Sequence, residues 1–132
     1  MVLVDANVLL DILTDDPEWR LWSEEKLLAV VEADQAAVNP IIYAELSAAY
    51  RTATELERAL SGWPLQQLSL PYKAAFPAAQ AFLQYRRKGG QRRSPLPDFY
   101  IGAHAAVEGL SLLTRDAPRY QTYFPKVKLI AP

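Results

Sequence analysis

The sequence predicts an α/β domain with a mostly parallel sheet of four to five strands. Short apolar runs recur along the chain, and such runs are typical of strands that are buried on both faces of a sheet. Longer stretches with apolar residues at helical spacing separate these runs. Prolines, glycines and capping residues mark most of the boundaries. Strands that alternate with helices favour a parallel sheet.

Length and composition indicate one globular domain over residues 1–132. The chain is 51% hydrophobic and 22% charged, which is ordinary for a folded protein with one core. It contains no cysteine, which excludes disulfides, thiolate catalysis and cysteine–zinc sites and fits a cytoplasmic protein. Asp5 and Asp11 interrupt the apolar start of the chain, so we expect neither a signal peptide nor a membrane span.

The first half of the chain predicts two buried strands, each followed by helices. The strands are expected at residues 2–4 and 36–38. The helices are expected at residues 8–14, 17–31, 41–50 and 55–60. Asp16-Pro17 and Asn39-Pro40 each combine a capping side chain with a proline suited to the first helical turn, so both predict helix starts.

The second half predicts two long helices and further strands. Residues 65–70 form either an edge strand or an extended connection, and later strands are expected at residues 110–113 and 127–130. An amphipathic helix is expected over residues 72–88, with Pro77 in its first turns and a stop at the two glycines that follow. A second helix is expected over residues 99–108, ending at Gly109.

Four acidic residues lie at the predicted ends of these elements: Asp5, Glu45, Asp98 and Asp116. Asp5 and Asp116 follow strands, whereas Glu45 and Asp98 lie early on helices. Parallel α/β sheets place ligand sites beyond the carboxyl ends of their strands, so four acids from four segments can meet there. Any one of them alone is equally explained as a cap or a surface charge, and Asp98 suits the first turn of a helix on its own account.

Clustered carboxylates next to apolar sequence are costly to desolvate unless a cation lies among them. Mg²⁺ and Mn²⁺ prefer carboxylate and water oxygens as ligands. Such an ion can polarise a phosphoryl oxygen, activate a water and shield a leaving oxygen. The pattern therefore predicts a metal-dependent nuclease.

The charges separate along the chain. Residues 1–60 contain 12 acidic and 4 basic residues, whereas residues 61–132 contain 3 acidic and 10 basic residues. Five of these bases surround two glycines: Arg86, Arg87, Lys88, Arg92 and Arg93. A solvated helix end would also carry such residues. Beside an acidic site, however, a separate basic cluster is needed to attract phosphate, so we expect these five to hold the phosphate backbone of a nucleic acid.

Four segments carry a resemblance to a known family. Residues 2–10 read VLVDANVLL, residues 41–46 read IIYAEL, residues 97–105 read PDFYIGAHA and residues 112–116 read LLTRD. In this order and spacing the chain resembles a PIN-domain ribonuclease of the VapC type, the toxin of VapBC toxin–antitoxin pairs. The resemblance covers nearly the whole chain and implies a three-layer α/β/α PIN-like fold.

The resemblance implies a hydrolase, a Mg²⁺- or Mn²⁺-dependent endoribonuclease. By position, Asp5 and Asp98 would be the principal metal ligands, with Glu45 and Asp116 completing the catalytic site directly or through water. Some relatives carry the last acid a few residues later, and we take Asp116 as its equivalent. Two more residues, Asn7 and Thr114, would orient carboxylates or water. The implied partners are an RNA substrate, a small VapB-like antitoxin and a second copy in a homodimer.

Several alternatives compete with this interpretation. A haloacid dehalogenase-like phosphatase also opens with a strand ending in Asp. It needs a second Asp where this chain has Asn7, and it needs a lysine before its final acidic motif, but no lysine lies between Lys88 and Asp116. A catalytically inactive PIN-like scaffold that binds RNA or protein would be expected to have lost one or more acids. We expect His104, the single histidine, to have a structural or surface role, and the tryptophans to pack in the core or at interfaces.

Overall fold

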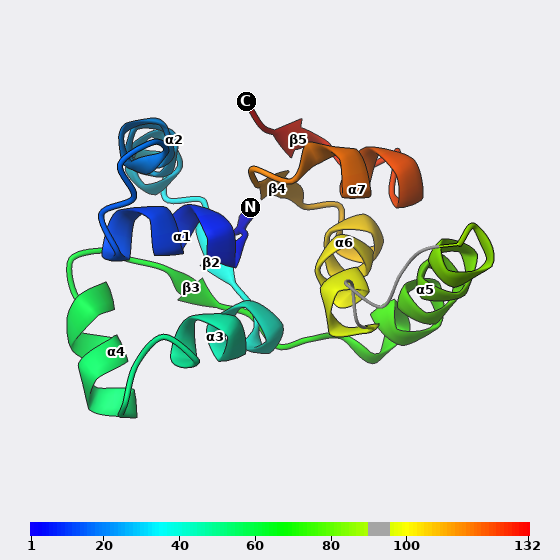
Figure 1. Ribbon diagram of the computed structural model, residues 1–132, viewed down its shortest axis with the longest axis horizontal. Coiled ribbons are helices and arrows are strands. Elements are labelled where there is room, and N and C mark those ends of the chain that lie inside the picture. The colour runs from blue at the N-terminus through cyan, green and yellow to red at the C-terminus, as the bar shows by residue number, and fades with distance from the viewer. Residues whose placement is uncertain (90–95) are drawn as a thin grey trace.

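Five short strands form one sheet in the computed structural model, which describes residues 1–89 and 96–132 (Figure 1). The strands are β1 (Val2–Val4), β2 (Ala36–Val38), β3 (Gln66–Gln67), β4 (Ser111–Leu113) and β5 (Leu129–Ile130). All four pairings are parallel, and the strand order is β3-β2-β1-β4-β5. The predicted parallel α/β sheet is confirmed.

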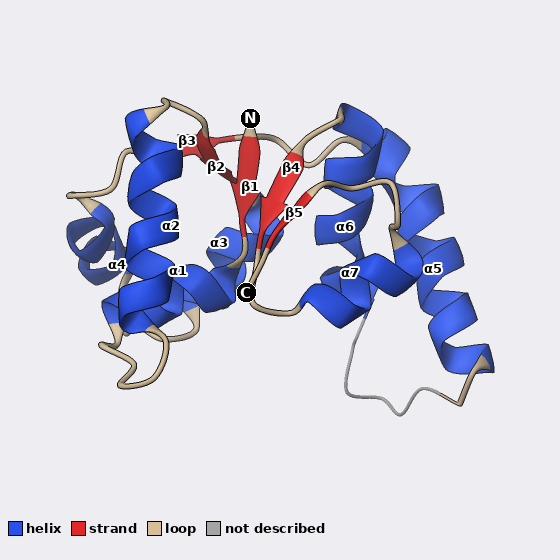
Figure 2. Cartoon of the chain, turned by 90° about the horizontal axis from the view of Figure 1, so that it is seen from above, coloured by secondary structure: helices blue, strands red, loops and turns tan. Residues whose placement is uncertain are grey.

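Helices cover both faces of this sheet. In the described residues they are α1 (Ala6–Leu13), α2 (Arg20–Glu32), α3 (Pro40–Ser47), α4 (Ala53–Leu60), α5 (Ala75–Arg87), α6 (Leu96–Glu108) and α7 (Ala117–Tyr123). Figure 2 shows α1, α2 and α4 on one side of the strands and α5, α6 and α7 on the other. The expected three-layer α/β/α arrangement is therefore confirmed.

The order in which the strands are added reverses at β1. The chain proceeds outward from β1 through β2 to β3, then crosses to the other side of β1 and continues outward from β4 to β5. Leu3 pairs with Leu112, and Val4 pairs with Leu113. In open parallel sheets, the crevice beyond the carboxyl ends of the strands at such a reversal is the usual place for a ligand. That crevice lies here between the ends of β1 and β4.

The core consists of the two central strands and the helices that pack on them. Leu3, Val4, Leu112 and Leu113 are fully buried, as is Phe99 of α6. This explains why β1 and β4 read as continuous apolar runs, because both faces of each strand are covered. Within the parts of the chain that the structure describes, no helix combines the length and the apolar character needed to cross a membrane.

Local capping fixes where several helices begin and end. Asn39 caps α3 by accepting a hydrogen bond from the amide of Ile42 at 2.9 Å, and Pro40 follows it in the first turn. Thr52 caps α4 in the same way through the amide of Glu55. Gly109 follows α6 with φ +67°, a backbone conformation that side chains with a Cβ disfavour. These signals explain why element positions were predictable along most of the chain.

Several boundaries differ from the predictions: α3 ends at Ser47 rather than near Tyr50, and β5 spans only Leu129–Ile130. Three further differences concern α2, α5 and α7. The carboxylate of Asp16 accepts two amide hydrogen bonds in a turn, so α2 starts only at Arg20. The expected helix over residues 72–88 begins with a 3₁₀ turn, Tyr72–Ala74, before α5. The helix α7 was not predicted at all. It follows Asp116 directly and places its side chains at the crevice between β1 and β4.

Candidate active site

Asp5 follows the carboxyl end of β1, where the strand order of the sheet reverses. Its amide donates to the carbonyl of Leu113 at 2.9 Å, which ties it to the end of β4. Its Oδ1 accepts a hydrogen bond from the amide of Ala6 at 2.8 Å and so caps α1. One carboxylate oxygen is thus used for the helix start, and the other faces the crevice.

Three side chains donate to that second oxygen of Asp5. Thr114 Oγ1 lies 2.8 Å from Oδ2, the hydroxyl of Tyr120 lies 3.2 Å away and Asn7 Nδ2 lies 3.4 Å away. Asp5 is only 5% exposed, and burial raises its pKa above the usual value. The hydrogen bonds from Thr114, Tyr120 and Ala6 oppose this rise, because they favour the charged form of the carboxylate.

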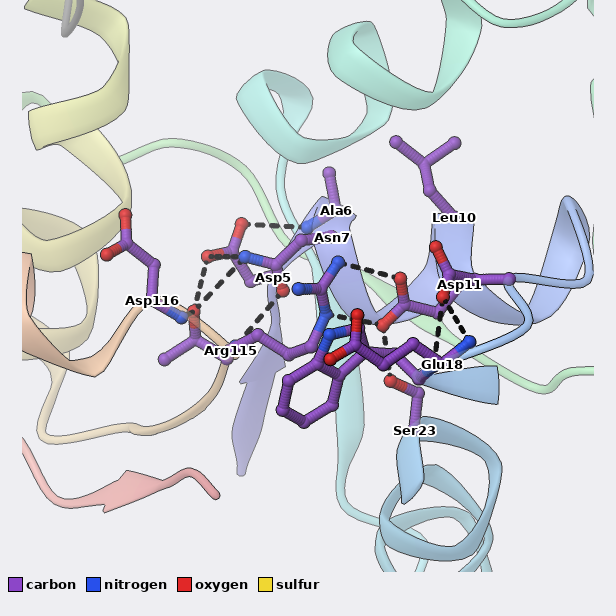
Figure 3. A network of polar contacts seen from close by, with 12 residues as sticks. Asp5, Ala6, Asn7, Leu10, Asp11, Glu18, Ser23, Arg115 and Asp116 are labelled. Atoms are coloured by element: carbon purple, nitrogen blue, oxygen red, sulfur yellow. Dashed lines mark hydrogen bonds and ion pairs between the residues drawn. The ribbon is translucent and has the colours of Figure 1, made fainter. Parts of the chain in front are cut away.

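Asn7 and Thr114, which we expected to orient other groups, both lie against Asp5. Thr114 is fully buried, and its Oγ1 also accepts a hydrogen bond from the amide of Asp116 at 3.0 Å. Asn7 Oδ1 accepts a hydrogen bond from the amide of Arg115 at 3.2 Å. Figure 3 shows this network running from Asp5 to the loop after β4. The loop and the start of α1 are therefore held together by side-chain hydrogen bonds.

Glu45 of α3 shares an electrostatic environment with two of the other acids. Its pKa is raised to about 7, first by burial and then by the charges of Asp5 and Asp98. The charge of Arg119 acts in the opposite direction. A negative charge raises the pKa of a carboxyl group only when it lies near that group. The effect of Asp5 and Asp98 on Glu45 therefore indicates that acids from three separate segments lie near one another. The charges of Asp5 and Asp98 thus act on Glu45, and a common metal site of these acids stays a prediction.

Arg119 of α7 forms ion pairs with both the fourth acid, Asp116, and Asp98. The guanidinium of Arg119 lies 3.7 Å from Asp98 Oδ2 through Nη1 and 3.5 Å from Asp116 Oδ2 through Nη2. Burial raises the pKa of Asp98, Arg119 lowers it, and Asp116 raises it. The protein therefore supplies one cation of its own to its acidic site. Sequence reasoning gave Tyr120 no role in the site and missed Arg119, although the pair Asp116 and Arg119 has the i, i+3 spacing of a helical ion pair.

A divalent ion suits these residues by their chemistry. The donors are all carboxylate oxygens, which hard cations such as Mg²⁺ and Mn²⁺ prefer. Burial and the charges of neighbouring carboxylates raise the pKa of Glu45, and a cation beside it would offset both effects. Across residues 1–89 and 96–132, no three acidic or histidine side chains are arranged so that they could hold a metal ion as they stand. Binding would therefore require the acids to approach one another more closely.

A second polar network, which was not predicted, lies beside the first. Asp11 of α1 is 3% exposed and forms an ion pair with Arg115, and Ser23 donates to the same carboxylate at 2.6 Å. A third buried contact joins Asn39 Nδ2 to His104 Nδ1 at 3.0 Å. His104 is buried, and burial lowers its pKa. Of the two roles expected for His104, the surface one is wrong.

The basic cluster is only partly within the described residues. Arg86, Arg87 and Lys88 are exposed at the end of α5, on the side of the molecule toward which the strands run (Figure 2). Lys88 Nζ lies 5.8 Å from the centre of the Tyr123 ring of α7. Arg92 and Arg93 lie outside the described residues.

The aromatic residues that we expected to pack do so. Trp22, Tyr50 and Trp63 lie partly buried against the core, and Trp19 contacts Trp22 edge to face with ring centres 6.0 Å apart. A cavity of about 610 Å³ runs along α3 and is lined by Pro40, Tyr43, Ala44, Ser47 and neighbouring residues. None of the four acids is among its lining residues, so the acidic site is separate from it.

Comparison with known proteins gives one family and several similar folds. A model of the PIN domain family matches residues 2–124. The structure of VapBC2 from Rickettsia felis, bound to a DNA fragment from their promoter, has 17% identity and a TM-score of 0.72, with 99% of this chain and 98% of that chain covered. DNA-bound VapBC from Salmonella typhimurium has 21% identity and a TM-score of 0.71, with 98% and 96% covered. FitAcB from Neisseria gonorrhoeae has 20% identity and a TM-score of 0.63, with the same coverage. No match was found among curated proteins.

Proposed function

The chain belongs to the PIN domain family, and from this premise we propose that it is a metal-dependent endoribonuclease that acts as the toxin of a toxin–antitoxin pair. The observation that carries the proposal is the meeting of acids at the carboxyl edge of the sheet. The pKa of Glu45 rises to about 7, partly through the charges of Asp5 and Asp98. A surface with no function for these charges would not be expected to bring three of them together.

Asp5, Glu45, Asp98 and Asp116 would hold the ion in this proposal. A bound Mg²⁺ or Mn²⁺ would polarise the scissile phosphate, favour ionisation of the attacking water and shield the leaving oxygen. The protein's own residues prepare the site for it. Thr114, Tyr120 and Asn7 donate to one oxygen of Asp5 and so keep that carboxylate fixed.

Glu45 has a further role in the proposal. With a pKa of about 7 its carboxyl group can hold or release a proton near neutral pH, as a group that takes a proton from water must. Binding of a cation would lower this pKa, because positive charge favours the carboxylate. The proton lost from Glu45 would then accompany metal binding, and metal affinity should increase with pH.

In this proposal, basic side chains outside the acidic group hold the RNA backbone. Arg86, Arg87 and Lys88 are exposed at the end of α5, and Arg92 and Arg93 follow them in the sequence. Their positive charge offsets the repulsion that the acids exert on phosphates. Reversing the charge of Arg86 and Arg87 should weaken RNA binding and flatten its dependence on salt. Unchanged binding at low salt would refute this role.

The partners in the proposal follow from family and fold. The similar structures from Rickettsia felis and Salmonella typhimurium are VapBC complexes with DNA. We propose accordingly that a small VapB-like antitoxin binds this chain and masks the acidic site, that the chain forms a homodimer, and that it acts in the cytoplasm. Co-expression with the antitoxin of a neighbouring gene, followed by gel filtration with mass determination, measures both assemblies.

One observation favours a second candidate, a catalytically inactive scaffold. Arg119 lies within 4 Å of the carboxylates of Asp98 and Asp116, so the acidic group already has a cation without any metal. An inactive scaffold would bind no Mn²⁺ at this place. The active nuclease would bind it in a manner that depends on Asp5.

The deciding experiment is cleavage of total RNA by the purified protein with Mg²⁺ or Mn²⁺. It is run beside an EDTA control, an Asp5→Asn variant and an Asp34→Asn variant, which changes an exposed acid far from the acidic group in sequence. Discrete fragments that depend on metal and on Asp5, but not on Asp34, would support the nuclease. Absence of cleavage together with absence of Asp5-dependent Mn²⁺ binding would favour the scaffold.

A further inference from the structure

Arg115, in the loop between β4 and α7, contacts α1 with its side chain. Its Nε donates to Asp11 Oδ2 at 2.6 Å and its Nη2 donates to Asp11 Oδ1 at 2.8 Å, which makes a two-pronged ion pair. The Asp11 side chain is 3% exposed and that of Arg115 is 27% exposed, so the carboxylate is shielded from water while the guanidinium is partly open to it. Arginine suits such a contact because its planar guanidinium matches both oxygens of one carboxylate. Figure 3 shows the two side chains facing each other beside the acidic site.

Two residues from the segment around α2 complete this contact. Ser23 Oγ donates to Asp11 Oδ2 at 2.6 Å. The guanidinium carbon of Arg115 lies 4.9 Å from the ring centre of Trp19, within the range of a cation–π contact. We call these four residues, Arg115, Asp11, Ser23 and Trp19, the Arg115 clamp. It joins the loop after β4 to α1 and to the start of α2.

The backbone of the same residue belongs to the acidic site. The amide of Arg115 donates to Asn7 Oδ1 at 3.2 Å. On one side of it, Thr114 Oγ1 donates to Asp5 Oδ2 at 2.8 Å. On the other side, the amide of Asp116 donates to Thr114 Oγ1 at 3.0 Å. A fixed position of Arg115 therefore also fixes Thr114, which donates to Asp5, and Asp116, which is a proposed metal ligand.

Stability alone does not explain a buried ion pair at this place. Removing two charges from water is expensive, and well-packed apolar residues of the same volume often stabilise a protein equally well. An ion pair with two hydrogen bonds differs from apolar packing in its directionality, because it sets the position of both partners. What the pair supplies here is a defined position for the loop.

We propose that Arg115 is a positioning residue of the acidic site, whose clamp to α1 holds residues 114–116 where Thr114 can orient Asp5 and Asp116 can face the other acids. The inference rests on the proposed function, because it takes Asp5 and Asp116 as metal ligands. Arg115 itself touches neither the metal nor the RNA in this proposal. Its removal should leave the fold intact and loosen the loop.

The first test needs no metal and measures amide hydrogen exchange by NMR. The variants are Asp11→Asn, which keeps the side-chain shape, and Arg115→Gln, which shortens the side chain; both remove the charge. The amides of Arg115 and Asp116 should exchange at least 10-fold faster in both variants. The amide of Leu112, which donates to Lys128 at 2.9 Å within the sheet, should be unchanged. Equal exchange at residues 115 and 116 in variant and wild type would overturn the proposal, whatever the activity.

The second test measures the site itself. In Arg115→Gln and Asp11→Asn, Mn²⁺ affinity should fall about 10-fold or more, the range seen when residues that orient metal ligands are lost. For RNA cleavage kcat should fall while KM stays the same, because the clamp does not contact the substrate. The double variant should be no worse than either single one, since both remove one contact.

Arg20→Gln is the matched control. Arg20 also makes two ion pairs, with Asp15 at 2.6 Å and with Glu24 at 2.9 Å, but it lies on α2 and those partners lie outside the acidic site. Its Mn²⁺ affinity and kcat should equal those of wild type. Wild-type affinity and kcat in Arg115→Gln would overturn the proposal while leaving the nuclease standing. A wild-type protein that neither binds Mn²⁺ nor cleaves RNA would overturn the proposed function instead, and the exchange rates would still decide the positioning of the loop.

Discussion

Replacing Glu45 by Gln should change how the stability of the metal-free protein depends on pH. The pKa of Glu45 rises from the ordinary 4.5 to about 7 through burial and through the charges of Asp5 and Asp98. Between these two pH values the folded protein retains a proton that the unfolded chain has lost. The free energy of unfolding therefore falls as pH rises through this window. The side chain of Gln is uncharged throughout this pH range, so the Glu45→Gln variant lacks this contribution.

The size of the effect follows from the shift. One pKa unit corresponds to about 1.36 kcal/mol, so the rise from 4.5 to about 7 gives an upper limit of about 3.4 kcal/mol for Glu45. Its carboxylate is partly open to solvent, and screening by water reduces such contributions, so we expect ~1–2 kcal/mol. The Glu45→Gln variant should gain that much stability relative to wild type at pH 8, and almost none at pH 4.5.

Urea unfolding of metal-stripped protein at several pH values between 4.5 and 8 measures this difference. Glu25→Gln is the control, because Glu25 is exposed on α2. Asp5 and Asp98 also have raised pKa values, but they are present in all three proteins and their contribution is largely common to them. Parallel curves of stability against pH for wild type and Glu45→Gln would refute the electrostatic reasoning about the site.

Two further substitutions test the surroundings of the site by urea unfolding. Thr114→Val keeps the side-chain shape but removes the buried hydroxyl that donates to Asp5, so it should cost about 2–3 kcal/mol, whereas Thr114→Ser should cost clearly less; equal losses would contradict the role of the hydroxyl. Gly102→Ala would place a Cβ inside van der Waals contact with the ring of Phe124 and should cost about 1–3 kcal/mol. Gly62→Ala has no atom within 4 Å of the new Cβ and should show no such loss, so similar losses at both glycines would contradict the packing argument.

The positions of the acids were predictable because they depend on local sequence and one general rule. Asp5 ends a short apolar run, and Asp98 stands in the first turn of a helix, so each could be placed at an element's end from its neighbours alone. The carboxyl-edge rule for parallel sheets then brings the ends together. No knowledge of side-chain contacts was needed for this step.

The cation in the site could not be placed in the same way. Arg119 depends on α7, a helix of seven residues that is too short to show a clear apolar period. Asp116 and Pro118 at its start resemble the Asp16-Pro17 signal and could have revealed it. Once the helix is recognised, Arg119 is one turn beyond Asp116 and its contact with that acid follows.

The Arg115 clamp was unpredictable for a different reason. Asp11 lies within an apolar helix face, and its partners Ser23 and Arg115 are 12 and 104 residues away along the chain. No periodicity or capping rule connects residues at such distances. A charged residue among apolar ones announces only that it needs a partner, and packing of the whole chain decides which one.

The strand order sets when this site can be assembled during synthesis. Asp5 and Thr114 are separated by 109 residues, yet each needs the other in place. A chain made from its N-terminus can pair β1 with β2 early, but the other side of β1 stays open until β4 and α7 have left the ribosome. The second side of the site forms only after β4 and α7 have been made. The acidic site of the proposed nuclease is therefore incomplete until the whole span from Asp5 to Asp116 has been made.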